Sequence, residues 1–161
     1  MVNNYLSTLT AISSDTIIVL AIVALLFFIA FQFGKGYITS IIVSVYISAF
    51  LYTNAFFVQK LVFVSNDVSK LFWNHLGIFL LFFIPIFYLL RNIISGEYGR
   101  RGKFIGGGLL AVATAGLILA IFYHVIPLNP VYNFSAGIDK LFATDMMFTI
   151  WLIIPLLALF I

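Results

Sequence analysis

The chain has 161 residues, of which 64% are hydrophobic and only 8% are charged, and its formal net charge is +3. Soluble domains average about 25% charged residues, and a chain of this size cannot bury so much apolar surface in water. The composition therefore predicts an integral membrane protein. It argues against nucleic-acid binding, because the few basic residues lie in loops between apolar spans.

Residues 1–161 are predicted to form a single polytopic membrane domain, since the sequence contains neither an internal repeat nor a linker. The absence of cysteine excludes disulfides and thiolate metal ligands. The first 14 residues contain no Lys or Arg, so the first apolar run is predicted to be a retained membrane helix rather than a signal peptide.

The first two spans are separated by a very short connection. The first is predicted over Thr16–Phe33, with Asp15 directly before it as a helix cap. Gly34-Lys35-Gly36 follows, and the second span is predicted over Tyr37–Val58. With only three residues between them, the two spans are expected to form a tight antiparallel hairpin.

The third and fourth spans are separated from the first two by a mixed interfacial region, Gln59–His75. The third span is predicted over Leu76–Leu90, where Pro85 is expected to bend the helix and leave one carbonyl without its usual partner. The fourth span is Phe104–Ile126, and Pro127 ends it.

The last apolar stretch, Met146–Ile161, follows a predicted loop over Leu128–Thr144. It covers about 24 Å at about 1.5 Å per residue, less than the roughly 30 Å of a hydrocarbon core. Pro155 shortens its regular part further, so the stretch either spans weakly or is re-entrant. The predicted fold class is an all-α integral membrane protein with four transmembrane helices plus a short fifth C-terminal apolar helix.

The glycine-rich stretch before the fourth span is not a phosphate loop. A Walker-type loop needs a glycine five positions before Gly102-Lys103 and a hydroxyl residue after it, but the chain has Glu97 and Phe104 there. Its basic residues indicate topology instead. By the positive-inside rule, this basic group is predicted to lie on the cytoplasmic side, which places the N-terminus outside. The same side chains are predicted to contact lipid headgroups. The group consists of Arg91, Arg100, Arg101 and Lys103.

Small residues recur at every fourth position in two of the spans. The second span carries Gly36, Ser40, Ser44 and Ser48, and the fourth carries Gly107, Gly108, Ala111, Ala115 and Gly116. Such patterns let helix backbones approach closely. These two faces are therefore predicted to be helix-packing surfaces that pair with each other, either within one chain or between chains.

The search for reactive chemistry finds no complete set of residues. His75, His124 and Asp145 all lie at predicted helix ends rather than in the middle of a span. His124 is either a proton-responsive or metal-binding group or simply an interfacial side chain, and no second ligand stands at suitable spacing. The sequence predicts no catalytic residues, no metal, no cofactor and no enzymatic activity.

Two short motifs resemble a known family. Asp15-Thr16-Ile17-Ile18-Val19-Leu20, an apolar span and then Gly34-Lys35-Gly36-Tyr37-Ile38 are similar to the start of the colicin V production proteins. Arg100-Arg101-Gly102-Lys103-Phe104-Ile105-Gly106-Gly107-Gly108 resembles that family's entry to its fourth span. The resemblance covers about Asp15–Ile126. It implies a small bacterial inner-membrane protein linked to bacteriocin export and envelope maintenance.

The sequence favours a small bacterial-type multi-pass protein of the plasma (inner) membrane that acts by assembly. Its expected partners are membrane lipids and either further copies of itself or other proteins of an envelope or export complex. The alternative is a channel or carrier subunit, because Pro85 and Pro155 are able to interrupt helices and expose backbone carbonyls.

Overall fold

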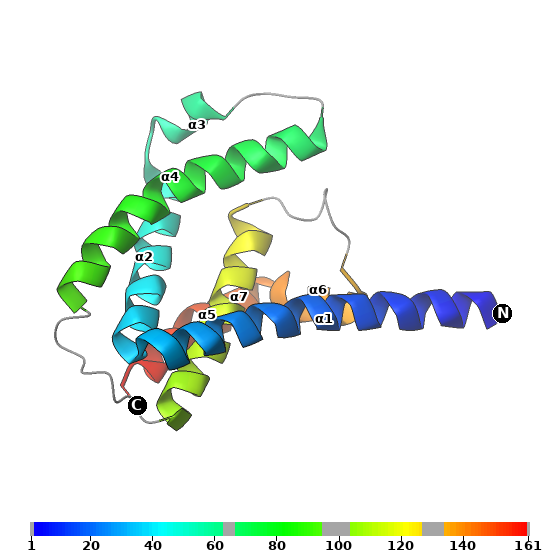
Figure 1. Ribbon diagram of the computed structural model, residues 1–161. Helices are drawn as coiled ribbons and strands as arrows, with labels where there is room; N and C mark the ends of the chain where they lie inside the picture. The colour runs from blue at the N-terminus through cyan, green and yellow to red at the C-terminus, as the bar shows by residue number, and fades with distance from the viewer. Residues whose placement is uncertain (1, 63–66, 95–103, 127–133, 161) are drawn as a thin grey trace.

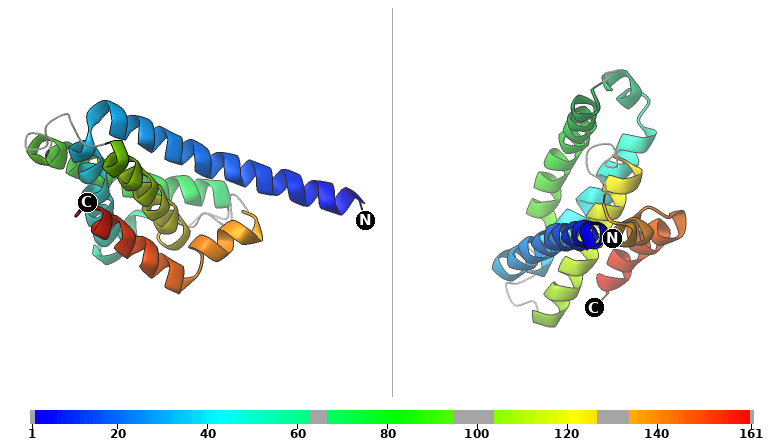
Figure 2. Two further views of the ribbon diagram at one scale, coloured as in Figure 1. Left: turned by 90° about the horizontal axis from the view of Figure 1, so that it is seen from below. Right: turned by 90° about the vertical axis from the view of Figure 1, so that its right-hand side faces the viewer.

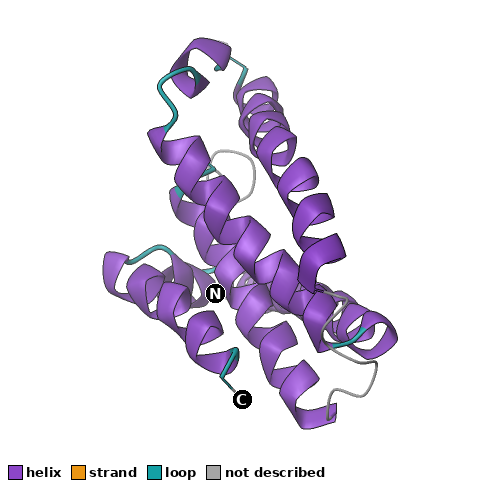
Figure 3. Cartoon of the chain, turned by 90° about the vertical axis from the view of Figure 1, so that its left-hand side faces the viewer, coloured by secondary structure: helices purple, strands orange, loops and turns teal. Residues whose placement is uncertain are grey.

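The computed structural model describes residues 2–62, 67–94, 104–126 and 134–160, with the backbone alone for residues 2–14, 104 and 105. Within these ranges every regular element is a helix (Figure 3). Four of the helices are long and apolar enough to cross a membrane. The predictions of an all-α fold and of four candidate membrane helices are therefore confirmed.

The first helix, α1 (Val2–Phe33), begins well before the predicted start at Thr16. Asp15 is consequently not a helix cap but lies within α1, so that prediction was wrong. The apolar part of α1 does begin where expected, because the candidate span covers Asp15–Phe33. The preceding turns continue the same helix and project beyond the bundle (Figure 1).

The second helix, α2 (Lys35–Asn54), leaves the end of α1 at a steep angle (Figure 1). The predicted antiparallel hairpin is thus not formed. The connection is Gly34 alone, which has a φ of 84° that glycine adopts readily. Packed helix axes lie about 8–10 Å apart, and one residue advances the chain by only about 3.8 Å, so Gly34 cannot return the chain alongside α1.

A short helix, α3 (Val58–Leu61), precedes α4 (Val68–Ile94). The fourth helix is longer than the predicted third span at both ends and continues through Pro85. Its ribbon changes direction part of the way along (Figure 1). Among the other helices, α2 provides nearly all the packing contacts of α4.

Aromatic side chains fill the contact between α2 and α4. Phe79, Phe83 and Phe87 stack in succession on α4, with ring centroids 6.3 Å and 5.7 Å apart. Tyr52 lies against Phe79 at one end of this row, and Tyr37 lies against Phe87 at the other. Aromatic pairs in this distance range add to the attraction from burial, so the Tyr52–Phe79 and Tyr37–Phe87 pairs strengthen the α2–α4 contact.

The fifth helix, α5 (Phe104–His124), is the centre of the bundle. It contacts α1, α2, α6 and α7. Of its candidate span 56% is buried, compared with 11% for those of α1 and α4. A helix that is surrounded by neighbours needs small side chains on several faces, which explains why its glycines and alanines are so frequent.

The C-terminal region contains two helices, α6 (Ala136–Phe142) and α7 (Asp145–Ala158), which are bent by 63° relative to each other. The predicted loop Leu128–Thr144 therefore contains a helix that sequence reasoning missed. The two helices together form either a broken span or a re-entrant segment. Pro155 lies within α7 without ending it.

The outer surface is strongly apolar. Large exposed side chains line α1 at Ile17, Leu20, Phe28 and Phe31, and line α4 at Trp73, Leu81, Ile84 and Tyr88. A water-soluble protein would not expose so many, whereas hydrocarbon solvates them readily. The described helices are thus compatible with a multi-pass membrane protein.

Candidate functional site

The small residues predicted on α2 lie inside the bundle. Gly36 is buried, and the side chains of Ser40, Ser44 and Ser48 are fully buried. The Ser40 hydroxyl donates to the Gly36 carbonyl at 2.9 Å, and the Ser44 hydroxyl donates to the Ser40 carbonyl at 2.6 Å. These two hydroxyls bond their own helix, so their value to packing is their small size.

Ser48 differs from the other two serines. Among the described residues, its Oγ is the one buried side-chain polar atom without a hydrogen-bond partner. Ser40 and Ser44, two turns and one turn earlier, instead bond carbonyls of their own helix.

The small residues of α5 meet two different neighbours. Ala111 and Ala115 are buried. A Cβ added to Gly107 would lie 3.8 Å from Ala30, and one added to Gly108 would lie 3.1 Å from a ring carbon of Phe27, both on α1. Gly107 and Gly108 of α5 thus make room for α1.

Gly116 accommodates α7 instead, because a Cβ at this position would collide with Trp151. The α2 and α5 helices do contact each other. The residue-by-residue pairing of the two stripes remains a prediction, since α1 and α7 are the neighbours that touch the α5 glycines.

Only one of the four basic residues assigned to topology is described. Arg91 lies in the last turn of α4, and its guanidinium carbon is 5.3 Å from the centre of the Tyr37 ring on α2. This cation–π contact joins the two helices at one end of the bundle. Arg100, Arg101 and Lys103 lie outside the described residues.

The most developed polar contacts converge at the C-terminal end of α5. The Ser135 backbone N–H donates to Oδ2 of Asp15 at 2.5 Å, joining residues 120 positions apart. The Tyr123 hydroxyl donates to Oδ1 of Asp139 at 2.9 Å. Ser135 directly precedes α6 and Asp139 lies in its first turn, so α1 and α5 together hold this short helix.

These contacts were not predicted from the sequence. Asp15 was predicted to lie at a helix end and Asp139 in a loop. The available signal was Asp15 itself. A carboxylate beside a long apolar run needs a donor when it is buried, and Asp15 is only 2% exposed.

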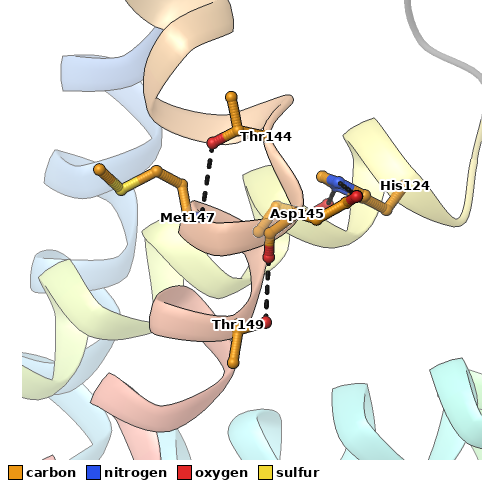
Figure 4. Close-up of polar contacts among 6 residues, drawn as sticks. His124, Thr144, Asp145, Met147 and Thr149 are labelled. Atoms are coloured by element: carbon orange, nitrogen blue, oxygen red, sulfur yellow. Dashed lines mark hydrogen bonds and ion pairs between the residues drawn. The ribbon is translucent and has the colours of Figure 1, made fainter.

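His124 lies beside this group and faces α7 (Figure 4). Its Nε2 is 3.8 Å from Oδ1 of Asp145, and its ring stacks on Phe148 with centroids 4.2 Å apart. Its Nδ1 lies 3.2 Å from the Ala120 carbonyl of its own helix. These contacts place the His124 side chain between α5 and α7.

A second histidine joins α2 to α4. Nδ1 of His75 and the hydroxyl of Tyr52 form a hydrogen bond. Among the described residues, no group of three or more His, Asp or Glu side chains is placed to hold a metal ion.

Comparison with known proteins found no matching family, no matching curated protein and no matching solved structure. The resemblance to colicin V production proteins therefore remains a prediction based on short motifs.

Proposed function

We propose that this chain is a small polytopic membrane protein of bacterial type that acts by assembly, either with itself or as a subunit of an envelope or export complex. The observation that carries this proposal is the one-sided attachment of α4. Nearly all of its packing contacts are with α2, and its other face remains exposed along the helix.

The exposed face of α4 also contains a small residue. Gly77 lies between Trp73 and Leu81 on this face, and a Cβ placed on it would meet nothing within 4 Å. Helices in lipid associate through close packing rather than through the hydrophobic effect, and glycine permits a close approach. The position therefore suits contact with another helix as well as contact with lipid.

The small-residue stripes do not themselves supply the assembly surface in this proposal. Ser44 and Ala111 are fully buried within one chain. The surface proposed for assembly is instead the free face of α4. The N-terminal turns of α1 extend away from the other helices (Figure 2) and are not part of this surface.

The proposed location is the plasma (inner) membrane, with the N-terminus outside. The support for it is the basic group Arg91, Arg100, Arg101 and Lys103, together with the resemblance to colicin V production proteins. That family would place the chain in bacteriocin export or envelope maintenance.

Cysteine crosslinking in native membranes tests assembly, and the chain has no cysteine of its own. Leu81→Cys and Tyr88→Cys place a thiol on the α4 face, where each native side chain is 62% exposed. Leu20→Cys on α1 is the matched control, because Leu20 is 66% exposed. Crosslinked species should form at positions 81 and 88 in preference to position 20. Equal yields at all three positions would indicate random collision and contradict the proposal.

A channel or carrier subunit is the second candidate, and the bent α6–α7 pair favours it. Transporters often build their sites from discontinuous helices whose interrupted backbone faces a pathway. The interruption lies at Ala143 and Thr144, between the two helices. Flux of ions and small solutes into proteoliposomes tests this candidate, and flux no greater than that of empty vesicles in both orientations would reject it.

A further inference from the structure

The helix α6 is too short to hold its own position. It has seven residues, and isolated helices shorter than about 12–15 residues are marginal in water. It is joined to α7 through Ala143 and Thr144, where the chain bends. The place of α6 in the bundle therefore depends on its contacts with other elements.

The end of α6 next to this bend is held by α7. The indole N–H of Trp151 donates to the Leu141 carbonyl at 3.0 Å. Phe142, which is buried, stacks on the Trp151 ring with centroids 5.2 Å apart. These contacts hold the C-terminal end of α6 against α7 next to the bend, and Phe142 also packs against Leu119 and Ala120 of α5.

The far end of α6 is held by α1. Ser135, the residue that precedes the helix, donates its backbone N–H to Asp15. Its carbonyl accepts the N–H groups of Ile138 and Asp139, at 3.0 Å and 3.1 Å. Through Ser135, the Asp15 carboxylate thus engages the first turn of α6. Between the two ends of α6, the Tyr123 hydroxyl of α5 donates a hydrogen bond to the Asp139 side chain.

Asp15 is the one buried charged residue among those whose side chains the structure describes. Burial of a carboxyl group is costly unless it is hydrogen-bonded, and its oxygens can accept a hydrogen bond in either protonation state. The backbone N–H of Ser135 donates this hydrogen bond to Asp15. A contact of this kind fixes one arrangement of two elements that are distant in sequence.

The helix α7 is held independently of Asp15. The Tyr46 hydroxyl of α2 donates to the Leu152 carbonyl, and Trp151 lies against Gly116 of α5. Thr144 caps α7 by accepting the Met147 N–H at 3.4 Å (Figure 4). Loss of the Asp15 contact would therefore leave α7 in place.

We propose that Asp15 is the anchor of a hinged segment: it holds the N-terminal end of α6 against α1, and when this contact is broken α6 turns about Ala143 and Thr144 while α7 stays fixed. Asp15 is a positioning residue in this arrangement. The inference does not depend on the assembly proposed above, because every contact it uses lies within one chain.

Distances between two spin labels test the hinge directly. Gly137→Cys on α6 and Ile153→Cys on α7 report the angle at the hinge. Gly137 has open space for a side chain, and Ile153 is 49% exposed. Leu109→Cys on α5 paired with Ile153→Cys is the control, because it reports whether α5 and α7 stay together; Leu109 is 44% exposed.

In the Asp15→Ala protein, the 137–153 distance distribution should broaden and shift, while the 109–153 distribution stays as in the unaltered protein. Asp15→Asn should change the distribution less than Asp15→Ala, because its amide oxygen can still accept the Ser135 N–H. Tyr123→Phe, which removes the bond to Asp139 and keeps the Asp15 side chain, should produce a smaller shift than Asp15→Ala.

Four outcomes would contradict the hinge proposal. An unchanged 137–153 distribution in Asp15→Ala would show that Asp15 does not anchor α6. A shift of the 109–153 control pair, or loss of both the Asp15→Ala and Asp15→Asn proteins from the membrane, would show that Asp15 supports the whole bundle. A shift in Tyr123→Phe as large as that in Asp15→Ala would make Tyr123 the principal anchor.

Discussion

Gly116 of α5 lies against Trp151 of α7 so closely that no side chain fits between them. An ideal Cβ at position 116 would lie 2.0 Å from Cζ3 of the indole and 2.1 Å from its Cε3. The Trp151 ring is in turn held by its N–H bond to the Leu141 carbonyl and by stacking on Phe142. A side chain added at position 116 must therefore displace the Trp151 indole, which disturbs its hydrogen bond to Leu141 and its stacking on Phe142.

Gly116→Ala should destabilise the protein for this reason. Overpacking of a tight contact typically costs about 1–3 kcal/mol. Thermal unfolding in mild detergent measures the effect. In the Trp151→Leu background, Gly116→Ala should cost less than it does in the unaltered protein, because the smaller side chain makes room for the new methyl group.

Gly106→Ala is the matched control on the same helix. A Cβ at Gly106 would meet nothing within 4 Å. In a helix, alanine is favoured over glycine by about 0.5–1 kcal/mol, so this variant should be neutral or slightly more stable. Equal destabilisation by Gly106→Ala and Gly116→Ala would show that the Trp151 contact is not responsible.

Ser44→Leu and Ala111→Leu should each weaken folding, because both positions are fully buried on helices that contact each other. The added volume is expected to cost about 1–3 kcal/mol in each case. Ser44→Ala should be mild, because the serine hydroxyl bonds only its own helix at Ser40. The measurement is retention of the folded species on gentle electrophoresis with increasing detergent.

Phe28→Leu is the proper control for these variants, since Phe28 is 59% exposed. Phe27 is less suitable, although the sequence alone makes the two look alike, because its ring approaches Gly108. If position 28 and positions 44 and 111 tolerate leucine equally, these stripes are not close-packed faces.

The apolar runs predicted the four long helices because membrane helices require continuous stretches of apolar residues. Their ends were less predictable. Polar residues before Thr16 hid the early start of α1, and the turn-forming Ser135 and Gly137 hid α6. A helix that continues past an apolar run leaves no signal in hydropathy alone.

The polar contacts of the candidate site were predictable only in part. Sequence reasoning singled out His124 as the most distinctive group, yet its contacts are with side chains of α7 and with its own helix. Asp15 meets Ser135 across 120 positions, and Tyr123 meets Asp139 across a connection without regular sequence signals. Such pairs depend on how the chain turns between helices, which local patterns do not specify.

The Tyr52–His75 hydrogen bond should contribute to the α2–α4 contact. Tyr52→Phe keeps the ring beside Phe79 and removes only the hydroxyl. The expected loss is about 1 kcal/mol, typical of one hydrogen bond. A double-mutant cycle with His75→Ala, read by thermal unfolding in detergent, isolates the pair. Additive effects of the two substitutions would mean that the bond contributes nothing.

The orientation of the chain can be tested at the two ends of α4, which runs from Val68 to Ile94. The positive-inside rule places Arg91 and its following basic residues in the cytoplasm, so the beginning of α4 should face outside. Ser69→Cys and Asn92→Cys are single thiols near opposite ends of this helix, and both native residues are exposed. A membrane-impermeant thiol reagent added to intact cells should label position 69 and not position 92. After the membrane is opened, both positions should react, which controls for thiol accessibility. Labelling of position 92 alone in intact cells would reverse the proposed orientation and place the N-terminus inside.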